Sequence, residues 1–339
     1  MPTTLEDVAR KAGVSQMTVS RVINGKNNVA EDTRQKVLQV IDELGYVPHL
    51  QAQRLASGRT RTIVLHYPLS NPRLVSNLIE LNFITGIAQG AADEGYYFSL
   101  ATGALTPPGL KKLCRGADAD GLVLMQIALH DWRVEFLREQ DYPFVMIGRA
   151  ANNRGLTFID FDIEKAILDA YAYLVGLGHR HIGFVTFPQE WRAQELGGAR
   201  RALLGFQIAT RQFQIRPLYR ESDLAIKRGY WSARSLLAED ARLTAIVTVH
   251  NTLSVGAITA LQEAGRKVPD DCSVLDIAIG DESDLVTPPL TGMEWPSYDM
   301  GFQAGKMLIR HLKGESRGPE QVLVPPKLKV RGSTAPPSG

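Results

Sequence analysis

Residues 4–24 of the chain read TLEDVARKAGVSQMTVSRVIN, and this segment carries the clearest signal in the sequence. Thr4, followed by two acids in the next turn, forms a variant of the helix capping box, and apolar residues then recur at helical spacing up to Gly13. Ser15 can cap a second helix with its own apolar stripe. Two short helices joined by a glycine turn predict a helix-turn-helix.

A third helix is expected from about Glu31 to Leu44, after a break at residues 24–28 and with Gly45 as its stop. A small three-helix cap without any role on DNA is the alternative to a DNA-binding head. The outward face of the second helix argues against that alternative, because it carries hydrogen-bond donors and long side chains where an ordinary solvated helix favours Glu and Lys. These outward residues are Gln16, Met17, Thr18, Ser20 and Arg21.

The charge distribution agrees with a DNA-binding head. Residues 1–61 carry nine Lys or Arg and six Asp or Glu, which gives +3, so the remaining residues carry 2 − 3 = −1. A basic head on a nearly neutral body is typical of a protein that binds DNA through one end. Without the helical motif, the same charge would fit a solvated basic face equally well.

Residues 4–24 resemble the signature of the lactose-repressor/galactose-repressor family of transcription regulators. Later landmarks similar to that family extend along the chain, at residues 177–182, 264–271, 287–291 and 330–333. The resemblance implies an N-terminal all-α helix-turn-helix head. It also implies an α/β core with two lobes and parallel sheets, like that of periplasmic binding proteins.

The resemblance also implies roles on DNA for individual residues of the head. Gln16, Met17 and Arg21 lie where the family reads base edges in the major groove. Arg can pair with guanine and Gln with adenine, whereas Met offers only apolar contact, for example to a thymine methyl group. Phosphate contacts suit short polar side chains and helix starts. The residues placed for them are Thr4, Ser15, Thr18, Ser20, Asn24 and Thr33.

Residues 46–61 are expected to form a hinge helix and linker. Pro48 can open a helix and Gly58 can close it, but so short a helix does not hold by itself in water. The resemblance implies that it forms when two copies pack together on DNA. Leu55 then matches the family's minor-groove wedge and Ala52 the small residue that lets paired hinges approach. A plain linker leucine is the alternative for Leu55.

From Thr62 onward, short apolar runs alternate with helical stretches, which predicts parallel sheets flanked by helices. Two similar halves indicate two lobes with a ligand cleft at the carboxyl ends of the strands. We therefore expect a head at 1–45, a hinge at 46–61 and an effector-binding and dimerisation core at 62–339. The family resemblance implies that the chain crosses between the lobes three times, which places one lobe at about 62–160 plus 292–320 and the other at 161–291 plus 321–339.

Seven residues are candidates for the effector cleft: Tyr67, Gln126, Arg149, Phe161, Trp191, His250 and Asn251. Arg149 can bind an anionic effector or bridge the lobes, and core packing is the alternative for Phe161 and Trp191. The polar groups that sugar-binding family members carry in the cleft are mostly replaced here, by Ala202, His250-Asn251 and Ala278-Ile279, and Leu224 replaces a stacking aromatic. Because buried sugar hydroxyls need fixed partners, these replacements favour an effector other than a typical sugar.

Other classes of protein find less support. The sequence has no nucleophile elbow, phosphate-binding loop or zinc-protease motif, so no enzyme, cofactor or metal is predicted. It has no apolar run long enough to span a membrane and no apolar signal core, and its two cysteines cannot form a disulfide framework. A cytoplasmic protein is expected. The tail lacks leucine heptads, which favours a homodimer over a tail-assembled tetramer.

These observations predict a sequence-specific DNA-binding transcription regulator, interpreted as a repressor. Two heads would read the halves of a near-palindromic operator, and a small molecule between the core lobes would control operator affinity. The direction of that control stays open. The alternative is a solute-binding protein of the periplasmic-binding class without a role on DNA, which accounts for the body but not for the head. An enzyme on the same two-lobed core is a third hypothesis.

Overall fold

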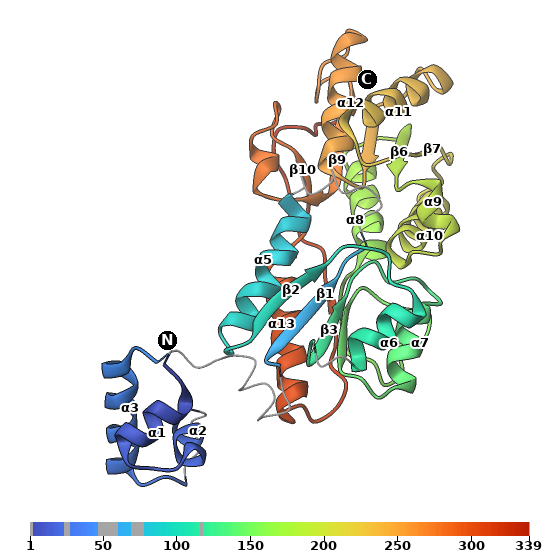
Figure 1. The fold of residues 1–339 in the computed structure, drawn as a ribbon. Helices are drawn as coiled ribbons and strands as arrows, with labels where there is room; N and C mark the ends of the chain where they lie inside the picture. The colour runs from blue at the N-terminus through green and yellow to red at the C-terminus, as the bar shows by residue number, and fades with distance from the viewer. Residues whose placement is uncertain (1–2, 24–27, 47–59, 69–77, 116–117, 339) are drawn as a thin grey trace. The chain divides into compact units, whose positions relative to one another are not determined.

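The computed structural model describes residues 3–23, 28–46, 60–68, 78–115 and 118–338. The chain divides into two compact units, residues 1–60 and residues 61–339 (Figure 1).

The N-terminal unit contains three short helices: α1 (Leu5–Ala12), α2 (Gln16–Ile23) and α3 (Glu31–Leu44). The Thr4 capping box is present, because the Thr4 hydroxyl accepts from the Asp7 amide and the Asp7 carboxylate accepts from the Thr4 amide. Gly13 and Gly45 end α1 and α3 with φ angles of +67° and +57°, a region that glycine enters without a steric cost. The signals that predicted these helices therefore also set their ends.

A buried apolar cluster holds the three helices together, and it includes Val8, Val19, Val37 and Tyr46. Tyr46 is 8% exposed and its amide donates to the carbonyl of Ile41. The packing thus extends the head to Tyr46, one residue beyond the boundary expected from the sequence. That boundary was set by Gly45, which stops the helix but does not end the packed core.

The first lobe of the core unit is built on a six-stranded sheet in which all pairs are parallel. Its order is β11 (Gln321–Val324), β5 (Phe158–Phe161), β4 (Phe144–Ile147), β3 (Gly121–Leu124), β1 (Thr62–His66) and β2 (Tyr97–Ala101). Alternate residues enter different cores: Ile63 and Leu65 pack in one cluster and Val64 in another. The sheet is therefore apolar on both faces, as buried parallel sheets are.

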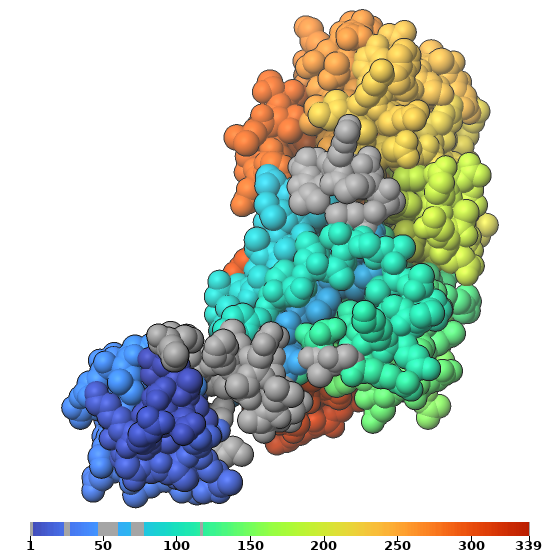
Figure 2. Space-filling model, viewed as in Figure 1, coloured from blue at the N-terminus to red at the C-terminus, as the bar shows by residue number. Residues whose placement is uncertain are grey.

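Helices α5 (Leu78–Ala92) and α13 (Ser297–Lys313) pack against each other beside this sheet, and α6 (Pro107–Arg115) packs with α7 (Trp132–Glu139). A Cβ on Gly86 would lie 2.2 Å from the carbonyl oxygen of Tyr298, so α5 and α13 approach through glycine. Figure 2 shows the red C-terminal part of α13 against the green first lobe.

The second lobe has a second six-stranded sheet, parallel except where β12 joins β10. Its order is β12 (Leu328–Lys329), β10 (Thr291–Glu294), β9 (Ser273–Ile279), β8 (Ala245–Thr248), β6 (Ile182–Thr186) and β7 (Tyr219–Glu221). Its helices are α8 (Ile163–Gly176), α9 (Gln189–Ala193), α10 (Gly197–Gln212), α11 (Ile226–Glu239) and α12 (Asn251–Glu263), with a 3-10 turn, η2, at Asp281–Asp284. Pairs α8–α10 and α11–α12 pack together.

The chain passes between the lobes three times, but at slightly different points from those expected. Strand β10 was assigned to the first lobe and pairs with β9 in the second, whereas β11 was assigned to the second lobe and pairs with β5 in the first. Both are short strands whose partners are distant in sequence, so their own residues do not show which sheet they join.

In the described ranges, no helix is both long enough and apolar enough to cross a membrane. The same ranges hold no group of three or more His, Cys, Asp or Glu side chains that is placed to bind a metal ion.

Candidate functional site

The exposed face of α2 presents the three side chains predicted to read bases. Gln16, Met17 and Arg21 are all exposed, and Met17 reaches 64% exposure although it is a large apolar residue. Val19 and Val22 point the other way, into the core of the head. An exposed methionine between two polar residues is better explained by a binding face than by the packing of the head itself.

The start of α2 is fixed by a pair of hydroxyl groups. The Ser15 hydroxyl accepts from the Thr18 amide at 3.1 Å, and the two hydroxyl oxygens lie 2.9 Å apart. One hydroxyl hydrogen bonds within the pair, so the other can still donate outward, for example to a phosphate oxygen. Thr4 uses its hydroxyl in the capping box instead. Hydrogen bonds from Thr4 lower the pKa of Asp7.

The remaining residues predicted to contact DNA are placed less directly. Ser20 and Thr33 are half-buried on α2 and α3. Asn24, Ala52 and Leu55 lie outside the described residues.

A cavity of about 180 Å³ lies in the core unit, with a wall drawn from both lobes. Six of the seven predicted effector residues line it: Tyr67, Gln126, Arg149, Phe161, Trp191 and His250. Asn251 does not. It begins α12, and its side-chain amide donates to the Glu282 carboxylate at 2.8 Å. The expectation for Asn251 rested on its position just after strand β8, but the helix turns its side chain towards the η2 turn.

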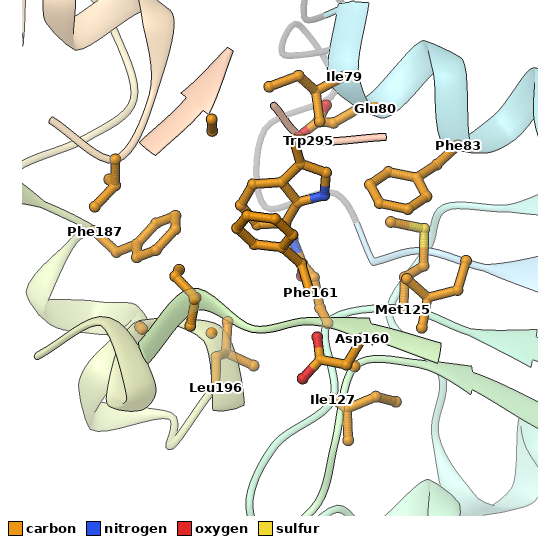
Figure 3. Close-up of a pocket in the computed structure, with 18 of the residues that line it drawn as sticks. Ile79, Glu80, Phe83, Met125, Ile127, Asp160, Phe161, Phe187, Leu196 and Trp295 are labelled. Carbon is orange, nitrogen blue, oxygen red and sulfur yellow. The ribbon is translucent and has the colours of Figure 1, made fainter. Parts of the chain in front are cut away.

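Aromatic rings occupy the middle of the cavity wall (Figure 3). Phe161 stacks on Trp295 with ring centroids 4.4 Å apart, and Phe187 stacks on Trp191 at 5.4 Å. Phe161 is only 1% exposed, so it serves both the core and the cavity. The two alternatives considered for Phe161 and Trp191, packing and ligand contact, are therefore compatible.

The charged side chains of the wall come from the first lobe. Arg149 donates through Nε to Asp160 Oδ2 at 2.8 Å, and this pair is largely buried. Burial raises the pKa of Asp160 in spite of that ion pair. On the second lobe, His250 Nδ1 accepts from the Thr252 amide, and burial lowers the pKa of His250 to about 4. His250 is thus neutral near pH 7.

A buried hydrogen-bond network holds the backbone at Gln126 in place. The Arg133 side chain pairs with Asp131 at 2.6 Å and donates to the carbonyls of Met125 and Gln126. Arg133 Nη1 also donates to His66 Nδ1 at 2.8 Å, so the imidazole is neutral and directs its Nε2 hydrogen to the Gly103 carbonyl. Gln126 itself has a φ angle of +52°, which is unusual for a residue with a side chain.

The lobes touch each other beside the cavity through backbone groups. Ala128 and Leu196 form an isolated antiparallel bridge, flanked by hydrogen bonds from Leu129 N to Glu195 O (2.9 Å) and from Gly197 N to Ile127 O (2.8 Å). Gly197 permits this contact, since a Cβ there would lie 2.9 Å from the carbonyl oxygen of Arg149.

Arg201 on α10 strengthens the same junction. Its guanidinium donates to the carbonyls of Arg149 and Ala150, at 2.9 and 3.0 Å, and lies 3.5 Å from Glu164. Arg149 therefore does bridge the lobes, but through its carbonyl rather than its side chain. Arg201 is not part of the cavity wall, and neighbouring Ala202 is fully buried.

Three of the replacements noted in the sequence, Leu224, His250 and Ala278, are found in the cavity wall. Leu224 and Ala278 both line the cavity, at the positions where sugar-binding relatives were expected to carry a stacking aromatic and an acid. Three polar residues of the wall, Glu80, Asp160 and Trp295, were not predicted. Glu80 lies in an apolar stretch of α5, and Trp295 follows β10. The one sequence feature that could have placed them in the cavity is a single polar group within or next to an apolar segment.

Comparison with known proteins gives two matching family models. Residues 4–49 match the model described as bacterial regulatory proteins, lacI family. Residues 171–334 match a periplasmic binding protein-like domain.

Similar proteins match over nearly the whole chain. Catabolite control protein A of Priestia megaterium is 31% identical, covering 98% of this chain and all of that protein. The HTH-type transcriptional regulator CelR of Thermobifida fusca is 30% identical over 97% of this chain and 98% of its own.

Solved structures agree with these relatives. The lac repressor dimer bound to operator and the anti-inducer ONPF has a TM-score of 0.85 and 25% identity, over 99% of this chain and 100% of that one. The complex of the regulator CelR with cellobiose has a TM-score of 0.72 and 28% identity, over 98% of this chain and 99% of that one.

Proposed function

Because the chain belongs to the lacI family of bacterial regulatory proteins, we propose that it binds a near-palindromic operator as a homodimer and represses transcription there. The protein is a DNA-binding transcription regulator. The observation that carries the proposal is the exposed trio Gln16, Met17 and Arg21 on a helix whose other face is buried. No catalytic step is part of this function.

Each head would place α2 in the major groove of one half-site. Arg21 is suited to guanine and Gln16 to adenine, and exposed Met17 to a thymine methyl group. Ser15 and Thr18 at the start of α2, with Thr4, Ser20, Asn24 and Thr33 around it, would contact phosphates and set the orientation of the helix. A regulator with these contacts acts in the cytoplasm, where the DNA lies.

Residues 46–61 would form the hinge that joins head and core, with Ala52 and Leu55 at the paired hinges and in the minor groove. This part of the proposal rests on the resemblance of the sequence to the family. A leucine wedge that opens a base step bends the DNA at the centre of the operator. Both heads of the dimer can then reach their half-sites only if the central base pairs deform easily.

The effector would bind in the cavity between the lobes and change the arrangement of the two lobes relative to each other. Its wall includes Ile127 and Leu196, which belong to the segments joined by the backbone bridge. A ligand that contacts both segments favours one arrangement of the lobes over another, and operator affinity changes by that difference in binding free energy.

Relatives differ in what their cavities hold. The solved CelR structure is a complex with cellobiose. Leu224 and Ala278 make the present cavity less polar than a sugar requires, which supports an effector of another kind.

Selection of bound duplexes from a random DNA pool by the full-length protein tests the proposal. We expect enrichment of one near-palindromic sequence, with symmetric half-sites, and binding as a dimer in sedimentation. Enrichment of no sequence, or of a site without symmetry, would contradict it.

A further inference from the structure

The two lobes contribute different chemistry to the cavity wall. Charged side chains, Glu80, Arg149 and Asp160, come from the first lobe, together with Tyr67 and Gln126. The second lobe contributes mainly apolar side chains, such as Leu196, Leu224 and Val249, and its His250 is neutral. The charged groups therefore lie on the first-lobe side, among apolar side chains such as Ile79, Phe83 and Met125, and the second-lobe side is mainly apolar.

Two polar atoms of the wall lack hydrogen-bond partners among the residues that the structure describes. Trp295 Nε1 is buried without an acceptor, and Glu80 Oε2 is buried without a donor. The other Glu80 oxygen accepts from the Tyr67 hydroxyl at 2.5 Å, which holds the carboxyl group in place. Buried polar atoms without partners are rare and costly in native proteins, so a ligand that pairs with both would bind with a clear advantage.

The charge of the cavity favours a ligand that donates at Glu80. Arg149 is balanced by Asp160 at 2.8 Å, whereas no ion pair involves Glu80 within the described ranges. The uncompensated group of the wall is thus a carboxyl group. Burial raises the pKa of Glu80. An amine placed there offsets this effect and gains a charge-assisted hydrogen bond with the ionised carboxylate, whereas a carboxylate ligand raises the Glu80 pKa further and gains no ionic partner.

The apolar side limits the rest of the ligand. Leu224, Val249 and Ala278 offer no side-chain hydrogen bonds, so a pyranose would leave hydroxyl groups unpaired against them. The stacked pair of Phe161 and Trp295 offers a flat aromatic surface at the centre of the cavity (Figure 3). A ring or other compact apolar body fits both surfaces.

We propose that the cavity binds a compact amine with an aromatic or alicyclic body, its amino group at Glu80 and its ring between Trp295 and the apolar side of the second lobe. This inference rests on the proposed function, because it concerns the same cavity. A hydrogen-bond acceptor on the ligand would also satisfy Trp295 Nε1.

Calorimetric titration of the full-length protein with four matched probes tests this inference. The probes are phenethylamine, phenylacetate, glucose and cellobiose. Phenethylamine and phenylacetate share a ring and differ in the charge of the end group. We expect phenethylamine to bind about tenfold or more tightly than phenylacetate, and more tightly than either sugar. Tighter binding of phenylacetate or a sugar, or no binding of phenethylamine, would overturn the inference.

Two variants then test whether the amino group of the ligand lies at Glu80. Glu80→Gln keeps the shape of the side chain but removes its charge, and we expect it to abolish the preference for phenethylamine over phenylacetate. Glu135→Gln, on the exposed face of α7, is the matched control and should retain the preference. Thermal melting checks that both variants fold. An unchanged preference in a folded Glu80→Gln protein would exclude Glu80 as the partner.

A second measurement separates this inference from the proposed function. Operator binding by the protein without ligand tests the DNA-binding role alone. If the protein binds its operator but not phenethylamine, the ligand inference fails and the function stands. If phenethylamine binds at Glu80 without changing operator affinity, the ligand inference stands and the proposed coupling fails.

Discussion

The three residues proposed to read bases all lie at positions 16–21 on the exposed face of α2, whereas the residues of the cavity wall come from segments between Tyr67 and Met300. These three side chains on α2 are exposed, whereas Val19 and Val22 hold the helix in the head. In the cavity, by contrast, wall residues and their neighbours also hold the lobes together, as Gly197 and Arg201 do. Substitutions on the exposed face of α2 should therefore change binding alone, while substitutions around the cavity should change binding, stability and lobe geometry together.

The largest effect is expected for the network behind Gln126. Arg133→Met leaves Asp131 buried without its cationic partner, and removal of one member of a buried pair typically costs about 3–5 kcal/mol. Urea unfolding of the core measures this loss.

Arg138→Met on the same helix is the control, because Arg138 is exposed, and it should change the free energy of unfolding by less than about 0.5 kcal/mol. Equal stability of the two variants would show that the buried pair does not support the cavity.

A smaller effect is expected where the lobes meet. Gly197→Ala places a methyl group against the carbonyl oxygens of Arg149 and Ile127, and such overpacking costs about 1–3 kcal/mol. We expect the lobes to separate at the bridge, which X-ray scattering would detect as a larger radius of gyration.

Gly198→Ala is the matched control, since a Cβ there meets nothing within 4 Å and both positions lie in the first turn of α10. If both variants melt and scatter alike, the bridge does not hold the lobes together.

The smallest effect is expected for the pH dependence of stability, through a buried aspartate in the second lobe. Asp276 is fully buried, accepting from the Ser254 hydroxyl and the Ala278 amide, and burial raises its pKa from near 3.8 to about 7. The folded state therefore holds a proton that the unfolded state releases, so stability falls as pH rises towards 7.

Asp276→Asn has no titrating group: its Oδ1 can still accept from the Ala278 amide, and its Nδ2 can donate to the Ser254 hydroxyl oxygen. The free energy of unfolding of the natural protein, compared with that of the variant, should fall by about 1 kcal/mol between pH 6 and pH 7. Parallel pH profiles for the two proteins would show that Asp276 does not take up a proton in this range.

The same contrast explains what could be predicted from the sequence. The head depends on local signals: Thr4 and Ser15 cap helices, Gly45 ends one, and alternating faces separate Arg21 from Val22. In the core, the alternation of apolar runs and helical stretches predicted the parallel sheets, and six cavity residues followed from their places after strands and from the family resemblance.

The remaining features depend on contacts between distant segments. Strand β11 joins the first sheet through its pairing with β5, which nothing in the residues Gln321–Val324 specifies. Glu80 resembles a surface residue of a helix until Tyr67 is placed beside it. Trp295 follows a strand that was assigned to the wrong lobe, so its ring was not expected against Phe161.

The central claim is that Arg21 on the exposed face of α2 reads a base of the operator. Fluorescence anisotropy of the selected operator duplex, titrated at one salt concentration with the natural protein and with Arg21→Ala, tests it most directly. We predict a loss of about 1–3 kcal/mol of binding free energy for each half-site, together with relaxed preference at one base pair. Unchanged affinity and unchanged sequence preference in the variant would contradict the claim.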